Sequence, residues 1–125
     1  MKKIIATTKA PEAIGPYSQA VEANGFVFLS GQLPIDPATG EFAPGGVKEQ
    51  TAQSFKNIAA ILAEAGLSTD NIVKTTVFLA DMSLFAEMNE VYASQFPGAF
   101  PARSAFAVKS LPKNALVEIE VIASR

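Results

Sequence analysis

Apolar residues recur with two different spacings along this chain, and the spacing predicts where strands and helices lie. Short apolar runs that are rich in β-branched and aromatic residues predict strands. Two longer segments repeat their apolar residues at helical spacing, which predicts amphipathic helices. The predicted strands are 2–7, 19–23, 26–30, 71–79, 105–108 and 116–123, and the predicted helices are 47–65 and a segment that is capped by Asp81 or Ser83 and ends at Phe96.

Turn residues separate these segments. Asn24-Gly25 joins two predicted strands, and this dipeptide is the strongest short hairpin signal. Ser30-Gly31 is expected to end the third strand, because glycine allows a sharp exit or a close approach by a ligand. Segment 32–46 is expected to be a long loop with an internal turn at 36–40, and Gly66 suits the position that follows a helix.

The last quarter of the chain holds most of the residues that indicate chemistry. Leu111–Ala115 contains the proline and asparagine of a turn, and it separates the apolar runs 105–108 and 116–123. We therefore predict a β-hairpin here, with the guanidinium of Arg103 at its mouth.

Two carboxylates share one face of the predicted final strand. Side chains alternate across a strand, so Glu118 and Glu120 lie opposite the apolar face that carries Val117 and Ile119. One interpretation is a solvated outer face, because charged residues are mostly exposed. The other is a carboxylate in a partly dry cleft, where its proton affinity suits acid–base chemistry. Arg103 also has a structural alternative, which is an ion pair with one of these glutamates.

The second predicted helix has one polar residue on its inner face. That face holds Phe85, Met88, Asn89, Tyr92 and Phe96. Since a buried amide needs hydrogen-bond partners, we expect Asn89 to be a core amide that the backbone satisfies.

The predicted element order is β-β-β-α-β-α-β-β, which indicates an α+β fold. Strand–helix–strand crossovers are right-handed, so both helices are expected on one face of a single mixed sheet. The run 26–29 and the final strand are nevertheless apolar on both sides, as strands covered on both faces are. Because so large an exposed patch would be unusual in a monomer, we expect an oligomer that packs these sheet faces together.

Composition narrows the chemistry. The 125 residues are 49% hydrophobic, which predicts a single domain over 1–125, and the formal net charge is −2. No apolar run approaches transmembrane length, so we expect a cytoplasmic protein with no membrane partner. The chain has no His, Cys or Trp, which excludes Ser-His-Asp and Cys-His nucleophiles and thiolate or imidazole zinc sites. Catalysis must then use other side chains, backbone groups and water.

Several short motifs, in order and at matching spacing, resemble the RidA (reactive intermediate deaminase) family, which is also known as the YjgF-like or L-PSP family. The similarity covers essentially the whole chain. The motifs are Ala13-Ile14-Gly15-Pro16-Tyr17-Ser18, Ser30-Gly31-Gln32, Val73-Lys74-Thr75-Thr76-Val77, Asn89 with Tyr92, Pro101-Ala102-Arg103-Ser104, Leu111-Pro112 and Glu118-Ile119-Glu120.

The resemblance implies a chorismate-mutase-like fold and a homotrimer with clefts between subunits. It also implies hydrolysis of reactive 2-imino acids, such as 2-iminobutanoate and 2-iminopropanoate, and of their enamine tautomers to 2-keto acids and ammonia, with neither a cofactor nor a metal. In the family, the arginine matching Arg103 grips the substrate carboxylate and the glutamate matching Glu118 positions water. Other matching positions line the cleft, and these are Tyr17, Ser30, Gly31, Asn89 and Ala105, the last through its backbone. Many relatives have Cys at the position of Ala105, so thiol chemistry is excluded there.

The residues themselves suit this activity. A guanidinium binds a planar carboxylate bidentately, and an imine carbon is already electrophilic enough to need no activated nucleophile. Structural hydrogen bonds remain the alternative role for Tyr17 and Ser30, and a structural ion pair is expected for Glu120. The alternative function is a trimeric module that binds small carboxylates without turnover. A ribonuclease or translation inhibitor is less favoured, because there is no histidine and no basic stripe for nucleic acid.

Overall fold

The computed structural model describes residues 1–125 and contains one six-stranded mixed sheet. Its strands lie in the order β1-β2-β3-β8-β6-β7, and every neighbouring pair is antiparallel except β6 and β7. The bounds are β1 Lys3–Ile5, β2 Ala20–Ala23, β3 Phe26–Gln32, β6 Ile72–Leu79, β7 Ala102–Ala107 and β8 Val117–Ser124.

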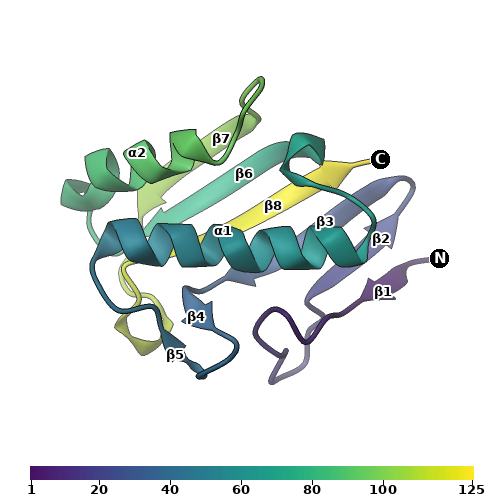
Figure 1. Cartoon of the computed structure of the whole chain (residues 1–125), viewed down its shortest axis with the longest axis horizontal. Helices are drawn as coiled ribbons and strands as arrows, with labels where there is room; N and C mark the ends of the chain where they lie inside the picture. The colour runs from purple at the N-terminus through teal and green to yellow at the C-terminus, as the bar shows by residue number, and fades with distance from the viewer.

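Two helices, α1 (Val47–Glu64) and α2 (Phe85–Ser94), cover one face of this sheet (Figure 1). The predicted α+β class, with both helices on the same face, is therefore confirmed. A cluster of 21 buried hydrophobic residues fills the space between the layers. The predicted apolar face of β8 belongs to it, since Val117, Ile119 and Ala123 are fully buried. The alternation of apolar residues along β8 thus fixes which face the helices cover.

Most turn signals are confirmed. Asn24 and Gly25 both have positive φ, at 53° and 81°, as the two central residues of a tight hairpin turn require. Gly66 follows α1 with φ of 76°, and its N–H bonds to the carbonyl of Ala63. Asp81 does cap a helix, but its carboxylate accepts from the N–H of Ser83 in a short 3₁₀ turn, Met82–Leu84, that precedes α2.

Two predictions about the middle of the chain were wrong. Segment 32–46 is not an unstructured loop, because β4 (Ile35–Asp36) and β5 (Glu41–Phe42) pair around the predicted turn. Strand β3 does not end at Ser30-Gly31 but continues to Gln32 through a β-bulge. Leu29 pairs with Val121 and Gln32 with Ile119, so two residues of β3 face one residue of β8.

The predicted C-terminal hairpin was also wrong. Strands β7 and β8 do not pair, because β6 lies between them and pairs with β7 in parallel and with β8 antiparallel. The turn residues are real, and they form a 3₁₀ turn at Pro112–Asn114 with positive φ at Asn114. Strand β8 lies in the interior of the sheet, because one of its faces is buried against the helices. Strand β7 is largely exposed and lies at the edge of the sheet.

The sheet face opposite the helices is open and carries several large apolar side chains. Phe26 and Phe28 on β3 are each 42% exposed, and Phe78 and Phe106 form an edge-to-face pair 5.5 Å apart on β6 and β7. We refer to this surface as the open face. No helix in the chain is both long and apolar enough to cross a membrane.

Candidate functional site

The guanidinium of Arg103 lies at the edge of the sheet and packs against α2. Its Nη1 donates a hydrogen bond of 2.6 Å to Oδ1 of Asn89. Its Cζ lies 4.6 Å from the ring centroid of Tyr92 and 5.4 Å from that of Phe85. Contacts of a cation with aromatic faces contribute about 0.5–2 kcal/mol each. Arg103 is therefore half-buried in an aromatic corner on the helix-covered side of the sheet.

Arg103 forms no ion pair. The chain has two, Lys48 with Glu90 and Arg125 with Glu22, so the structural alternative for Arg103 is wrong. Its only hydrogen-bond partner is a neutral amide, and Nε and Nη2 have no partner in the chain. A complete edge of the guanidinium, with a full positive charge, is thus available to an anion.

Arg125, in contrast to Arg103, has a structural role in this fold. Arg125 donates from Nε and Nη2 to the carboxylate of Glu22, at 2.7 and 2.9 Å. Its Nη2 also donates to the carbonyl of Ala65 at the end of α1. The guanidinium of Arg125 therefore ties the end of the last strand to β2 and to the C-terminus of α1, and its Nε–Nη2 edge is occupied by the carboxylate of Glu22.

The hydrogen bond of Asn89 corrects the prediction for this residue. We expected a core amide satisfied by the backbone, but Asn89 is half-buried and accepts from a side chain. The partner lies 14 residues away on another element, so local spacing carries no signal for it. Asn89 orients the guanidinium and also occupies one of its N–H donors.

Glu118 points to the open face, because its neighbours Val117 and Ile119 are buried beneath the helices. Its side chain is half-buried and accepts no hydrogen bond from the chain. Burial raises the pKa of Glu118, and the negative charge of Glu120 raises it further. The interpretation as a partly dry carboxylate is therefore favoured over a fully solvated one. Glu120 itself is exposed and forms no ion pair, so its predicted salt bridge was wrong.

Gly31 makes room for the carboxylate of Glu118. A Cβ at residue 31 would lie 2.7 Å from Oε2 of Glu118 and 3.0 Å from its Cδ, which is closer than carbon and oxygen approach without displacement. Gly31 belongs to the β-bulge opposite Glu120, and its φ is not in the left-handed region. The requirement for glycine here is therefore one of space, set by a side chain on the neighbouring strand.

Tyr17 and Ser30 line a shared cavity of about 490 Å³ beside the open face, together with Phe28 and Val21. The Tyr17 side chain is 53% exposed. The hydroxyl of Ser30 donates to the carbonyl of Ser18 at 2.6 Å, which fixes the loop that carries Tyr17 to β3. Ser30 therefore makes the structural hydrogen bond that was its alternative role. It also lines the cavity, as expected for a site residue.

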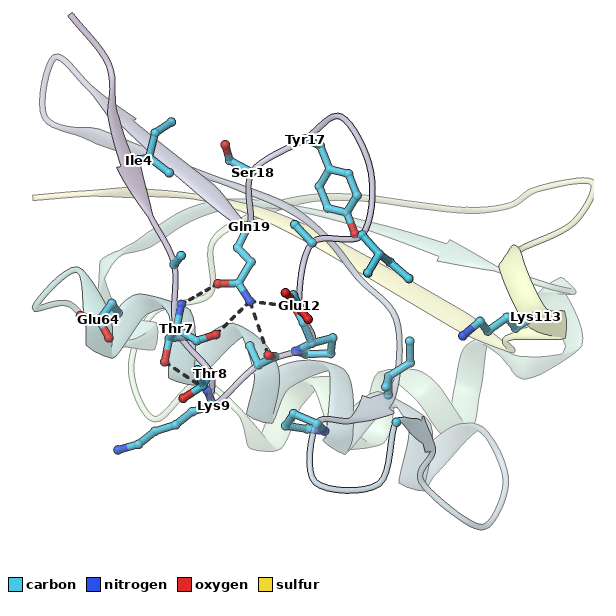
Figure 2. Close-up of a pocket in the computed structure, with 18 residues that line it drawn as sticks. Ile4, Thr7, Thr8, Lys9, Glu12, Tyr17, Ser18, Gln19, Glu64 and Lys113 are labelled. Carbon is cyan, nitrogen blue, oxygen red and sulfur yellow. Dashed lines mark hydrogen bonds between the residues drawn. The ribbon is translucent and has the colours of Figure 1, made fainter.

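A second cavity of about 1050 Å³ lies behind the same loop (Figure 2). Its floor is held by the buried amide of Gln19, which accepts from the N–H of Thr7 and donates to the carbonyl of Pro11, both at 2.7 Å. Sequence reasoning missed Gln19, because its partners lie several residues away in a segment without regular structure. Gln19 holds the N-terminal segment against the loop that presents Tyr17.

The predicted site residues form two separate groups within one chain. Arg103, Asn89 and Ala105 lie at the β7 edge on the helix-covered side, and Ala105 packs against the core. Tyr17, Ser30, Gly31 and Glu118 lie at the open face. We call these the arginine half-site and the glutamate half-site. They do not meet in one chain, and no three acidic residues lie close enough together to hold a metal ion.

Comparison with known proteins agrees with this fold. The family model described as Endoribonuclease L-PSP matches residues 7–125. A mouse protein named 2-iminobutanoate/2-iminopropanoate deaminase is 51% identical over 123 residues, covering 98% of this chain and 91% of the mouse protein.

Solved structures give the same result. A Yersinia pestis member of the conserved Rid protein family, YyfA, has a TM-score of 0.97 at 50% identity, with all of both chains covered. Escherichia coli TdcF with bound serine has a TM-score of 0.94 at 48% identity, and 98% of each chain is covered. This chain therefore belongs to the RidA family, whose model carries the L-PSP name.

Proposed function

We propose that this protein hydrolyses reactive 2-imino acids, such as 2-iminobutanoate and 2-iminopropanoate, to 2-keto acids and ammonia. The mouse relative that is 51% identical bears the name of this activity. The observation that carries the proposal is the unpaired edge of Arg103, because a small carboxylate fits that edge and no group of the chain competes for it.

The arginine half-site binds the substrate. Two parallel hydrogen bonds from the free edge of Arg103 hold the carboxylate, and charged hydrogen bonds of this kind contribute about 1.5–3 kcal/mol each. The carboxylate lies beside the planar imine carbon in a 2-imino acid, so holding one fixes the position of the other. Asn89 keeps the guanidinium in place. In the proposed site, the ligand also contacts the backbone at Ala105, two residues further along β7.

The glutamate half-site handles water. The carboxylate of Glu118 takes one proton from a water molecule as the water oxygen bonds to the imine carbon, and it passes that proton to the imine nitrogen, which gives a carbinolamine. Glu118 then takes the hydroxyl proton of the carbinolamine and gives it to the amino nitrogen as the C–N bond breaks and the C=O bond forms. One water is consumed, and ammonia and the 2-keto acid leave. A positioned acid–base group of this kind accelerates a reaction about 10²–10⁴-fold. The pKa of Glu118 is raised by burial and therefore lies closer to neutral pH than that of an exposed glutamate, which suits a group that both takes up and releases a proton.

One complete site requires two chains. Arg103 and Glu118 lie on opposite sides of the sheet, and a four-carbon substrate is too small to reach from one to the other. We therefore propose that the β7 edge of one protomer, with Arg103, Asn89 and Ala105, docks beside the open face of the next. Tyr17, Ser30, Gly31 and Glu118 of the second protomer complete the cleft. A cyclic trimer built from such head-to-tail contacts closes on itself and contains three equal sites.

The test is an imine assay. The protein is added to 2-iminobutanoate that a threonine dehydratase generates, and the loss of imine is followed against a sample without protein. We expect acceleration by the wild-type protein and none by the Arg103→Ala variant. If wild-type protein does not accelerate the loss of imine, the proposed activity is wrong.

A second candidate function is a module that binds amino or keto acids without turnover. The bound serine of Escherichia coli TdcF favours it, because that relative is 48% identical to this chain. The same experiment separates the two, since a binding module would bind 2-ketobutyrate in calorimetry and leave the rate of imine loss unchanged.

A further inference from the structure

Tyr92 is fixed at both ends beneath the guanidinium of Arg103. Its hydroxyl forms a hydrogen bond of 2.8 Å with Oγ1 of Thr75, and both side chains are buried. Its ring packs against Phe55 and Phe96, with centroids 5.6 and 5.1 Å apart. The ring therefore has one defined position between α2 and the sheet.

Thr75 and Arg103 are register partners on the paired strands β6 and β7. Partners in a parallel ladder project their side chains to the same face of the sheet. The Thr75 hydroxyl therefore holds Tyr92 next to the backbone of Arg103 on β7. The ring centroid of Tyr92 lies 4.6 Å from Cζ of Arg103. Phe85, at 5.4 Å, adds a second aromatic contact from the start of α2.

We propose that Tyr92, locked by Thr75, is a positioning residue that sets the height and tilt of the Arg103 guanidinium for carboxylate binding. The inference rests on the proposed role of Arg103 and deepens it. Asn89 fixes one N–H of the guanidinium, and one hydrogen bond leaves the plane free to rotate about that contact. The ring of Tyr92 removes this freedom, because a guanidinium in contact with an aromatic ring loses contact area when it rotates.

Loss of the hydrogen bond between Tyr92 and Thr75 should weaken substrate binding rather than slow the chemical step. Tyr92 and Thr75 touch neither Glu118 nor the open face, since both lie on the helix-covered side. A loosened guanidinium weakens the grip on the carboxylate but does not change how water is activated. The variants Tyr92→Phe and Thr75→Val should therefore raise KM for 2-iminobutanoate and Kd for 2-ketobutyrate about three- to tenfold, with kcat within about twofold of wild type.

The experiment measures KM and kcat in the imine assay, Kd for 2-ketobutyrate by calorimetry, and Tm for four proteins. These are wild type, Tyr92→Phe, Thr75→Val and the double variant. Because both substitutions remove the same hydrogen bond, the double variant should show no larger rise in KM than either single variant. A Tyr92→Leu variant, which also removes the ring, should raise KM about tenfold or more.

Thr51→Val is the matched control. Thr51 is as buried as Thr75, and its hydroxyl donates to the carbonyl of Val47 at 2.7 Å. This hydrogen bond lies within α1 and involves neither Tyr92 nor Arg103. This variant should lower Tm and leave KM and Kd unchanged.

Three outcomes would overturn the inference. KM and Kd could stay within twofold in Tyr92→Phe and Thr75→Val, kcat could fall in parallel with the rise in KM, or Thr51→Val could raise KM equally. These outcomes differ from a failure of the proposed function. If the wild-type protein proved inactive on imines, the binding of 2-ketobutyrate would still test the role of Tyr92 and Thr75.

Discussion

Arg103 and Glu118 project from opposite faces of the same sheet, and strand β6 separates the strands that carry them. Arg103 packs against α2 through Asn89 and Tyr92, whereas Glu118 lies at the open face above Gly31. A carboxylate grip and a proton-transfer group must lie within a few ångströms of one small substrate to act together. The two residues therefore cannot act together within one chain, which is why we propose that a second copy of the chain completes the site.

Replacement of Arg103 by alanine should abolish activity, and it should lower stability only through the loss of the contacts with Asn89, Tyr92 and Phe85. Loss of two charged hydrogen bonds of about 1.5–3 kcal/mol each corresponds to a decrease in kcat/KM of about 10²–10⁴-fold. Arg103→Lys should also be severely impaired, since an ammonium does not reproduce the bidentate edge. The imine assay and Tm measure the two effects.

Arg125→Ala is the matched control for this experiment. It removes the bidentate ion pair with Glu22 and the hydrogen bond to the end of α1, so Tm should fall while kcat/KM stays close to wild type. If Arg125→Ala lowers kcat/KM as much as Arg103→Ala does, then the loss of activity in Arg103→Ala reflects lower stability rather than the loss of carboxylate binding.

Replacement of Glu118 by glutamine should separate binding from turnover. Glutamine keeps the shape of the side chain but takes no proton from water, so kcat should fall about 10²–10⁴-fold. The Kd of 2-ketobutyrate, measured by calorimetry, should stay within a few-fold of wild type because Arg103 is untouched. Equal losses of binding and of turnover would reject a role for Glu118 in handling water.

The charge of Glu120 should influence the pH dependence of the reaction. This charge contributes to the raised pKa of Glu118, and activation of water requires the ionised form of Glu118. In Glu120→Gln the pKa of Glu118 moves down, closer to its ordinary value. The acid limb of the profile of kcat/KM against pH should therefore shift to lower pH. A shift to higher pH, or none, would contradict the coupling of these two carboxylates.

A methyl group at residue 31 should displace the carboxylate of Glu118. The Cβ of Gly31→Ala would lie 2.7 Å from Oε2, so we expect a loss of kcat of about tenfold or more and a lower Tm. Gly98→Ala is the control, because a Cβ there meets nothing within 4 Å and φ is not positive.

The source of the Gly31 effect can be checked by removing its partner. In the double variant Gly31→Ala with Glu118→Ala, the colliding carboxylate is gone, so Tm should recover towards that of Glu118→Ala alone. Additive losses of Tm would show that the cost at Gly31 arises elsewhere.

Local sequence patterns predicted what depends on local geometry. The alternation along Val117–Ala123 identified the buried face of β8, and Asn24-Gly25 identified a hairpin. The same alternation placed Glu118 on the uncovered side. These features follow from the period of the strand and from permitted backbone angles, and both can be read from neighbouring residues.

The pairing of strands could not be read in this way. Adjacent strands with a turn between them favoured a hairpin of β7 with β8, but β6 pairs with both of them. The face of Arg103 depends on its register with Thr75, and its contacts depend on α2. The sequence therefore singled out Arg103 and Glu118 as candidate site residues, but it did not predict that they lie on opposite faces of the sheet, because long-range packing sets their positions.

Mixing two inactive variants tests the shared site most directly. Arg103→Ala chains keep the glutamate half-site, and Glu118→Gln chains keep the arginine half-site. In oligomers assembled from equal amounts of both, an intact pair of half-sites forms wherever the two kinds of chain meet in the right order, which restores about a quarter of wild-type activity. We predict this recovery in the imine assay after co-expression. Activity no higher than that of the separate variants would show that Arg103 and Glu118 do not act across a contact between two chains.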